Sequence, residues 1–235
     1  MRAVELIPIV FLLFAALAIA VGIYGWRAAK ARRAALAALA AELGCRFSPN
    51  HDSRHDDHYR QFAIFQQGHS RYAFNTLRGD LDLFGSRCPL LAGDFHYATD
   101  SIDKDGKTTT TQHTFSFLIA NLPWSTPKLL VRPEGMFDKL KAAFGFDDID
   151  FESAEFSRKF YVQSSDKRFA YDVLHPRMME FLLAERPPML AIDGGALCVT
   201  NGSSVWQPNT FRARMDFVRR FSELMPRHLL QDLKT

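Results

Sequence analysis

Cysteine is scarce in this sequence, and its placement argues against a disulfide-bonded domain. The 235 residues contain three cysteines, Cys45, Cys88 and Cys198, which lie far apart and form no CxxC pair. An odd number of widely spaced cysteines is typical of reduced thiols, since disulfide frameworks use paired cysteines. The cysteines therefore favour a domain that stays in a reducing compartment.

A positive charge excess is missing from most of the chain. The first 33 residues carry five basic side chains and one acidic side chain, whereas the rest of the chain carries 24 basic and 25 acidic ones. Binding to the phosphates of a nucleic acid needs a clustered basic surface on the folded domain. We therefore predict no nucleic-acid partner.

The short motifs of common catalytic sites are also absent. The sequence has no GxSxG, no HExxH and no phosphate-binding loop, and Asp193-Gly194-Gly195 lacks the further glycines of a dinucleotide site. Cys198 lies in an apolar run, which is typical of a core residue rather than a nucleophile. We expect no cofactor, and these absences weigh against an enzyme without deciding the question.

A long uncharged segment lies near the start of the chain. Residues 6–26 contain no charged side chain, and as a helix they would span roughly 30 Å, the thickness of a bilayer core. A cleaved signal peptide is the alternative, because residues 18–20 (Ala-Ile-Ala) resemble a cleavage site. The run is longer than a signal-peptide core and is followed by cations, so we predict an uncleaved transmembrane anchor over residues 1–27 that contacts the lipid bilayer through residues 6–26.

The charges around this segment predict its orientation. One arginine precedes it, and four cations follow it: Arg27, Lys30, Arg32 and Arg33. By the positive-inside rule, we predict a single-pass membrane protein with its C-terminal domain in the cytoplasm. Ala18 and Gly22 form a small-xxx-small pair that would allow a homodimer through the membrane helix, but lipid-facing filler is the preferred interpretation because alanine is common there.

Residues 28–44 are rich in strong helix formers and predict a helical stalk. Leu36, Leu39 and Leu43 share one helix face, and Gly44 is placed to end the helix. We expect this leucine stripe to dock on the domain. A dimeric coiled coil is the alternative, but two heptads are too few to stand alone.

The rest of the chain, residues 45–235, predicts an α+β domain. Aromatic and β-branched residues at 71–77, 95–99, 111–119 and 128–131 predict an antiparallel meander, with turns at 78–80, 103–107 and 121–124. Residues 136–144 have helical spacing, 159–163 resemble a strand, and helices are expected from 167, from Pro176 and from Pro208. Hairpin turns are expected at 193–195 and 201–202. We therefore predict an antiparallel sheet with helices packed on one face.

A histidine-rich stretch is the strongest sign of chemistry. His51, His55 and His58 would share one face of a helix and could bind a metal such as zinc. However, residues 50–58 are poor helix formers and include no apolar side chain to dock on a core. The alternative is a solvated connector between stalk and sheet.

Two other groups of polar residues suggest sites. Asp94, His96 and His113 could converge across a hairpin as an acid–base set, but a one-residue change of register would move His113 to the other face. Residues 147–155 carry five carboxylates, and Ile149 and Phe151 alternate with them. That pattern predicts a half-buried strand whose acidic face docks on arginines of the last helix or on a partner.

Four stretches carry a family resemblance: FAIFQQGHSRYAFNTLRGD, GDFHYAT, DIDFESAEFSRKFYVQSSDKRFAYDVLHPRMMEFL and IDGGALCV. They resemble a group of uncharacterised bacterial membrane-anchored proteins, over roughly residues 60–225. The resemblance rests on aromatic and turn positions rather than catalytic signatures. It implies a protein of the bacterial inner membrane with an N-terminal membrane helix and a shared fold, and it implies no activity for any particular residue.

Together these observations favour one function over another. The preferred hypothesis is a single-pass membrane protein whose cytoplasmic domain binds or scaffolds a protein partner. The rival is a membrane-tethered hydrolase, either metal-dependent through His51, His55 and His58 or acid–base through the region of Asp94, His96 and His113. A third hypothesis places the basic segment after the membrane helix, together with the last helix, against anionic lipid headgroups.

Overall fold

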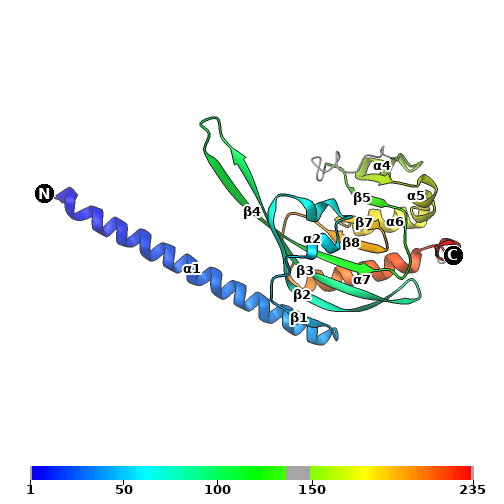
Figure 1. The fold of residues 1–235 in the computed structure, drawn as a ribbon, viewed down its shortest axis with the longest axis horizontal. Coiled ribbons are helices and arrows are strands. Elements are labelled where there is room, and N and C mark those ends of the chain that lie inside the picture. The colour runs from blue at the N-terminus through cyan, green and yellow to red at the C-terminus, as the bar shows by residue number, and fades with distance from the viewer. Residues whose placement is uncertain (1, 136–148, 234–235) are drawn as a thin grey trace.

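The computed structural model describes residues 2–135 and 149–233, with side chains from residue 12 onward. A long helix, α1 (Arg2–Glu42), precedes an α+β domain (Figure 1). α1 joins the apolar segment and the stalk in one helix, and its large apolar side chains between Leu12 and Trp26 are exposed. By length and composition, α1 is a candidate membrane helix.

The domain is built on one antiparallel sheet. In the described chain the sheet has eight strands in the order β1-β2-β3-β4-β8-β7-β5-β6, and every neighbouring pair is antiparallel. The strands are β1 (Arg46–Ser48), β2 (His69–Leu83), β3 (Ser86–Ile102), β4 (Thr108–Asn121), β5 (Leu129–Pro133), β6 (Phe160–Ser164), β7 (Met189–Asp193) and β8 (Ala196–Thr200). The α+β prediction is therefore confirmed.

The shorter helices cover the two faces of this sheet unequally. Besides α1, the described helices are α2 (His55–His58), the 3-10 helix η1 (Ala63–Gln66), α4 (Ala154–Lys159), α5 (Lys167–Val173), α6 (Pro176–Glu185), α7 (Pro208–Leu224) and α8 (Arg227–Asp232). One face packs against α1 and α4–α8 in the larger hydrophobic core. The other face is covered by residues 50–67, which contain α2 and η1 and bury a second, aromatic core.

The sequence explains the helix boundaries and the docking of the stalk. Ser153 and Asp166 cap α4 and α5 by accepting backbone N–H hydrogen bonds, and Pro176 and Pro208 start α6 and α7. On α1, Leu36 and Leu39 are buried in the larger core. The predicted docking of the leucine stripe is thus confirmed.

β3 and β4 extend beyond the sheet as a free hairpin. Their pairing is continuous from Leu90 opposite Ala120 to Ile102 opposite Thr108. Residues 100–112 are all exposed, and Figure 1 shows this hairpin projecting from the domain on the same side as the N-terminal half of α1. We call residues 100–112 the arm.

Several local predictions are wrong. The expected turn at 78–80 lies inside β2, because cross-strand pairing with β3 continues through Arg78-Gly79-Asp80. The turn at 193–195 is confirmed as the β7–β8 hairpin, but residues 201–207 form a loop that leads into α7 rather than a second hairpin. The helix expected at 136–144 lies outside the described residues.

The acidic segment also differs from its prediction. Ile149 and Phe151 are buried as expected, yet residues 149–152 are irregular and lead into α4. The arginines of α7 pair with other carboxylates: Arg212 with Glu42, Arg219 with Asp216 and Arg220 with Glu185. The described part of the acidic segment therefore does not pair with these three arginines.

Candidate functional site

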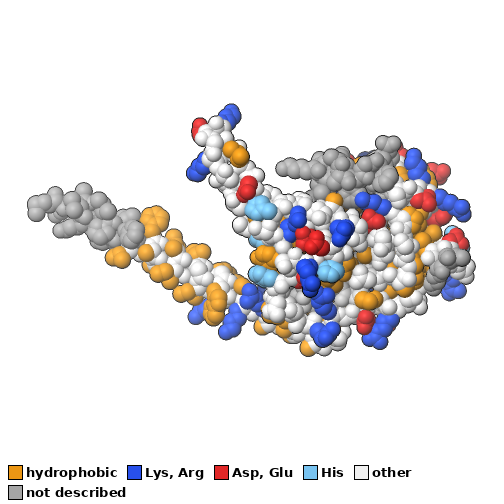
Figure 2. All heavy atoms as spheres, in the orientation of Figure 1, with side chains coloured by type: hydrophobic (Ala, Val, Ile, Leu, Met, Phe, Trp, Pro, Cys, Tyr) orange, Lys and Arg blue, Asp and Glu red, His pale blue; other side chains and the backbone are white. Residues whose placement is uncertain are grey.

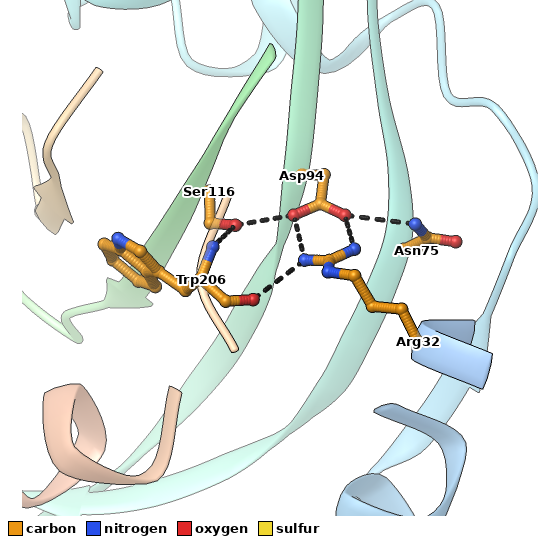
Figure 3. Close-up of polar contacts among 5 residues, drawn as sticks. All are labelled: Arg32, Asn75, Asp94, Ser116 and Trp206. Carbon is orange, nitrogen blue, oxygen red and sulfur yellow. Dashed lines mark hydrogen bonds and ion pairs between the residues drawn. The ribbon is translucent and has the colours of Figure 1, made fainter. Parts of the chain in front are cut away.

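A buried carboxylate on β3 joins α1 to the sheet. Asp94 is fully buried and faces α1 (Figure 3). Arg32 of α1 binds it with both terminal nitrogens, Nη1 to Oδ2 at 2.5 Å and Nη2 to Oδ1 at 2.9 Å. Ser116 donates its hydroxyl to Oδ1 at 2.6 Å, and Asn75 donates its amide to Oδ2 at 3.0 Å. Each carboxylate oxygen therefore accepts two hydrogen bonds, which uses its full acceptor capacity.

The loop before α7 closes this network. The backbone N–H of Trp206 donates to Ser116 Oγ at 2.8 Å, and the carbonyl of Trp206 accepts from Arg32 Nη2 at 3.0 Å. Residues from α1, β2, β3, β4 and the loop thus meet at one point, as Figure 3 shows. We call these five residues, Arg32, Asn75, Asp94, Ser116 and Trp206, the anchor junction.

Local backbone geometry places Asn75 in the junction. The β2–β3 register shifts between Phe74 and Leu77, which marks a bulge, and Asn75 has a positive φ of 49° there. Asparagine tolerates this left-handed conformation better than most residues, and bulges re-aim side chains. The bulge therefore explains why Asn75 turns its amide toward Asp94.

The junction connects α1 firmly to the domain. A guanidinium that binds a carboxylate with two nitrogens has a defined geometry, and burial protects the pair from screening by salt. Leu36, Leu39 and Ala40 of the same helix lie in the hydrophobic core one turn and more beyond Arg32. The orientation of the domain relative to α1 is consequently determined by polar and apolar contacts together.

The structure separates the three residues proposed for acid–base chemistry. Asp94 and His96 face the α1 side, whereas His113 is opposite Tyr97 and stacks on its ring at 4.6 Å, on the other face of the sheet. His96 stacks on Tyr72 at 4.7 Å, and burial lowers its pKa. The observed register thus produces the arrangement in which His113 does not meet the other two.

The three histidines proposed as metal ligands are also apart. His51 stacks on Tyr72 at 4.1 Å, His55 lies in the aromatic core on the opposite face, and His58 is exposed with Nδ1 2.7 Å from the Arg54 carbonyl. Only one helical turn, His55–His58, forms in this stretch. Within residues 2–135 and 149–233, no group of three His, Cys, Asp or Glu side chains could hold a metal ion.

His55 is a buried residue of the aromatic core. Its side chain is 1% exposed and lies among Tyr59, Phe65, Phe95 and Phe117, with ring centroids 4.5–5.5 Å apart. Neither ring nitrogen has a hydrogen-bond partner within the described chain. Burial lowers the pKa of His55 to about 4, opposed in part by Asp52 and Asp56. The neutral ring therefore packs as an aromatic side chain. The stretch 50–58 contacts the core through His55 and Asp56, whereas His51 and His58 are exposed as expected of a connector.

A polar cleft opens beside α2. Two adjoining depressions of about 280 Å³ and 550 Å³ share Tyr59, Arg78 and Leu91 in their walls. Arg78 pairs with Asp52 at 3.2 Å, and Asn121 donates to the Tyr59 hydroxyl at 3.3 Å. Figure 2 shows basic, acidic and histidine side chains gathered over α2 and the neighbouring strands. We call the two depressions together the α2 cleft.

Neither the anchor junction nor the α2 cleft is evident from local sequence patterns. Arg32 is one of four closely spaced cations after the apolar segment, and no local signal distinguishes it from its neighbours. The single indication was that Asp94 directly follows the apolar and small residues 90–93, since a carboxylate in a buried part of a strand needs a partner. The α2 cleft depends on the packing of residues 50–67 across the sheet, which spacing alone does not reveal.

Comparisons with known proteins add one likeness. No model of a known protein family matches this chain, and no characterised protein matches it by sequence. Among solved structures, it is similar to the crystal structure of the mycobacterial trehalose monomycolate transport factor A, TtfA, with a TM-score of 0.48 and 10% identity over 81% of this chain and 90% of that chain. A likeness at this level carries no argument about function.

Proposed function

We propose that this chain is a single-pass membrane protein whose domain lies on the cytoplasmic side and binds a protein partner. The observation that carries the proposal is the anchor junction, through which Arg32 of the candidate membrane helix binds buried Asp94. A domain tied to its anchor in one orientation presents the same surface to the cytoplasm at all times. That property suits the positioning of a partner at the membrane, because orientation is settled before the partner binds.

The exposed cations of α1 support the orientation. Arg32 is engaged with Asp94, whereas Arg27, Lys30 and Arg33 are exposed along the helix just after the apolar segment. Three cations at one end of the span still favour retention of that end in the cytoplasm. A reporter fused after residue 235 would be active only in its cytoplasmic form, and a periplasmic result would contradict the proposed location.

The α2 cleft is the surface that we assign to the partner. It combines a depression with aromatic and guanidinium groups, of which Arg78 lines both halves. Tyrosine and arginine are the residue types that carry most binding energy at protein interfaces. The hydrolase alternative has less support, since the described residues proposed for either of its sites do not converge.

The binding role is tested by charge reversal in the cleft. The full chain is purified in mild detergent after brief cross-linking in cells, as the original sequence, as Arg78→Glu and as Arg87→Glu. Arg87 is also exposed on the sheet but lies outside the cleft. We expect a stoichiometric protein partner with the original chain and with Arg87→Glu, and about tenfold less with Arg78→Glu, since a hot-spot residue contributes about 1–2 kcal/mol or more.

Two results would count against the proposal. Recovery of the original chain without any stoichiometric partner would contradict the binding role. Equal recovery with Arg78→Glu and Arg87→Glu would place the partner elsewhere on the domain.

A further inference from the structure

The arm has an unusual position for a hairpin. All of its residues from 100 to 112 are exposed, and the ion pair between Asp100 and His69 lies at its base. An isolated two-stranded hairpin is marginally stable in water, because it buries little apolar surface. A long hairpin of this kind therefore indicates a contact surface outside the domain.

The arm and the apolar segment of α1 both extend from the anchor junction. Arg32 and Asp94 touch at the anchor junction. Trp26, the last residue of the apolar segment, precedes Arg32 by six residues, or about 9 Å of helix. Ile102, near the tip of the arm, follows Asp94 by eight residues, or about 27 Å of strand.

The arm is long enough to reach the level of the bilayer. A 27 Å arm reaches a plane 9 Å away whenever its direction lies within about 70° of the axis of α1. Figure 1 shows that the arm and the N-terminal part of α1 leave the domain on the same side. An arm that leaves the domain on this side carries its tip toward the plane that contains Trp26, to one side of α1.

The chemistry at the tip suits the headgroup layer rather than the hydrocarbon core. Ile102 is 73% exposed, and Lys104 and Lys107 stand beside it. Asp103 is occupied within the turn, where Oδ1 accepts from the backbone N–H groups of Asp105 and Lys107. Lysines can bind lipid phosphates while an isoleucine inserts shallowly, whereas four charged side chains in the turn are too costly for the bilayer centre.

We propose that the tip of the arm, residues 101–108, is a second membrane contact that binds the phosphate headgroups of the bilayer crossed by α1. The proposal rests on the membrane anchoring given under Proposed function, but it does not depend on any protein partner. Since α1 already holds the domain at the surface, a weak contact is enough because its effective concentration is high. The domain is then held at two points, and its rotation about α1 is restricted.

A spin label at the tip tests this inference in the full chain. The chain carries Cys45→Ala, since Cys88 and Cys198 are buried, and a label at Ile102→Cys or at Arg87→Cys near the opposite end of β3. Each protein is placed in nanodiscs that contain phosphatidylcholine and phosphatidylglycerol. We expect collisions of the Ile102 label with a water-soluble nickel complex to be at least about threefold rarer than those of the Arg87 label, because the tip lies in the interface.

A second variant identifies the source of the protection. With Lys104→Glu and Lys107→Glu, the label at Ile102 should become as accessible as the label at Arg87, because anionic headgroups then repel the tip. Equal accessibility of the two labels in the original tip would overturn the proposal. Protection accompanied by spin–spin broadening, removed by dilution with unlabelled chain, would also overturn it by indicating contact between two copies. Neither outcome bears on partner recovery in the α2 cleft, so the two proposals fail separately.

Discussion

Replacement of Asp94 by alanine is expected to lower the free energy of unfolding by about 3–5 kcal/mol, because removal of one partner of a buried ion pair leaves the other charge uncompensated. Arg32 has 17% of its side chain exposed, so water recovers only part of its solvation. Asn75 and Ser116 lose their acceptor at the same time. The measurement is chemical unfolding of the full chain in detergent micelles, followed by tryptophan fluorescence, since Trp206 belongs to the junction.

A matched control lies six residues further along the same strand. Asp100 is exposed and pairs with His69 and Thr110, so Asp100→Ala should change stability far less than Asp94→Ala does. Arg32→Met combined with Asp94→Ala should be less destabilising than the sum of the single changes, because neither variant then buries a lone charge. Additive effects, or a loss below about 1 kcal/mol for Asp94→Ala, would show that the junction does not hold α1.

The second large effect is a loss of folding stability at low pH that arises from His55. The imidazole titrates near 6.5 in the unfolded chain, and burial lowers its pKa to about 4 in the fold. Between these two values the unfolded state binds more protons, so the stability present above pH 6.5 is lost as pH falls toward 4. The difference corresponds to about 3 kcal/mol over this window.

His55→Leu should remove this loss. A leucine of similar size fits among the surrounding aromatic rings and cannot be protonated, so its stability at pH 5 should exceed that of the original chain by about 2 kcal/mol. At pH 7 the variant should be equal or slightly more stable, since both ring nitrogens of His55 lack partners in the described structure. Unfolding curves of both proteins from pH 7.5 to 4.5 provide the comparison.

His58 offers a control from the same helical turn. Its side chain is exposed, outside the aromatic core, so His58→Leu should not give the gain in stability at pH 5 that is expected of His55→Leu. If His55→Leu retains the full pH dependence, groups other than His55 are responsible for it. If His55→Leu strongly destabilises the fold at pH 7, the ring makes polar contacts beyond those of the described residues.

Local patterns in the sequence predicted most of the elements. The apolar run, the leucine stripe of α1, the proline-initiated helices and the β7–β8 turn depend on neighbouring residues, and all are present. The errors share a cause. Residues 78–80 resemble a turn locally but are paired across to β3. Residues 149–152 alternate like a strand but form an irregular segment beside β6, where Ile149 donates its backbone N–H to the Val162 carbonyl.

The histidine stretch shows the same limit most clearly. Its spacing suggested a metal site or a solvated connector, and both interpretations treated the histidines as polar. In the fold, residues 62–65 bring an apolar cover over the sheet, so His55 becomes a neutral aromatic neighbour of phenylalanines. Whether an imidazole behaves as a ligand or as a core ring depends on its surroundings, which local spacing does not contain.

The sequence by itself determined that the chain has one apolar helix able to cross a membrane, a helical stalk and an α+β domain, because hydrophobic run length and periodicity are local properties. Only the tertiary structure decided which of four cations belongs to the domain, where His113 faces and how far the arm extends. Those outcomes depend on strand register and on contacts between residues up to 174 positions apart, such as Arg32 and Trp206. A buried carboxylate selects its partner by position in space, and that position exists only once the sheet has formed.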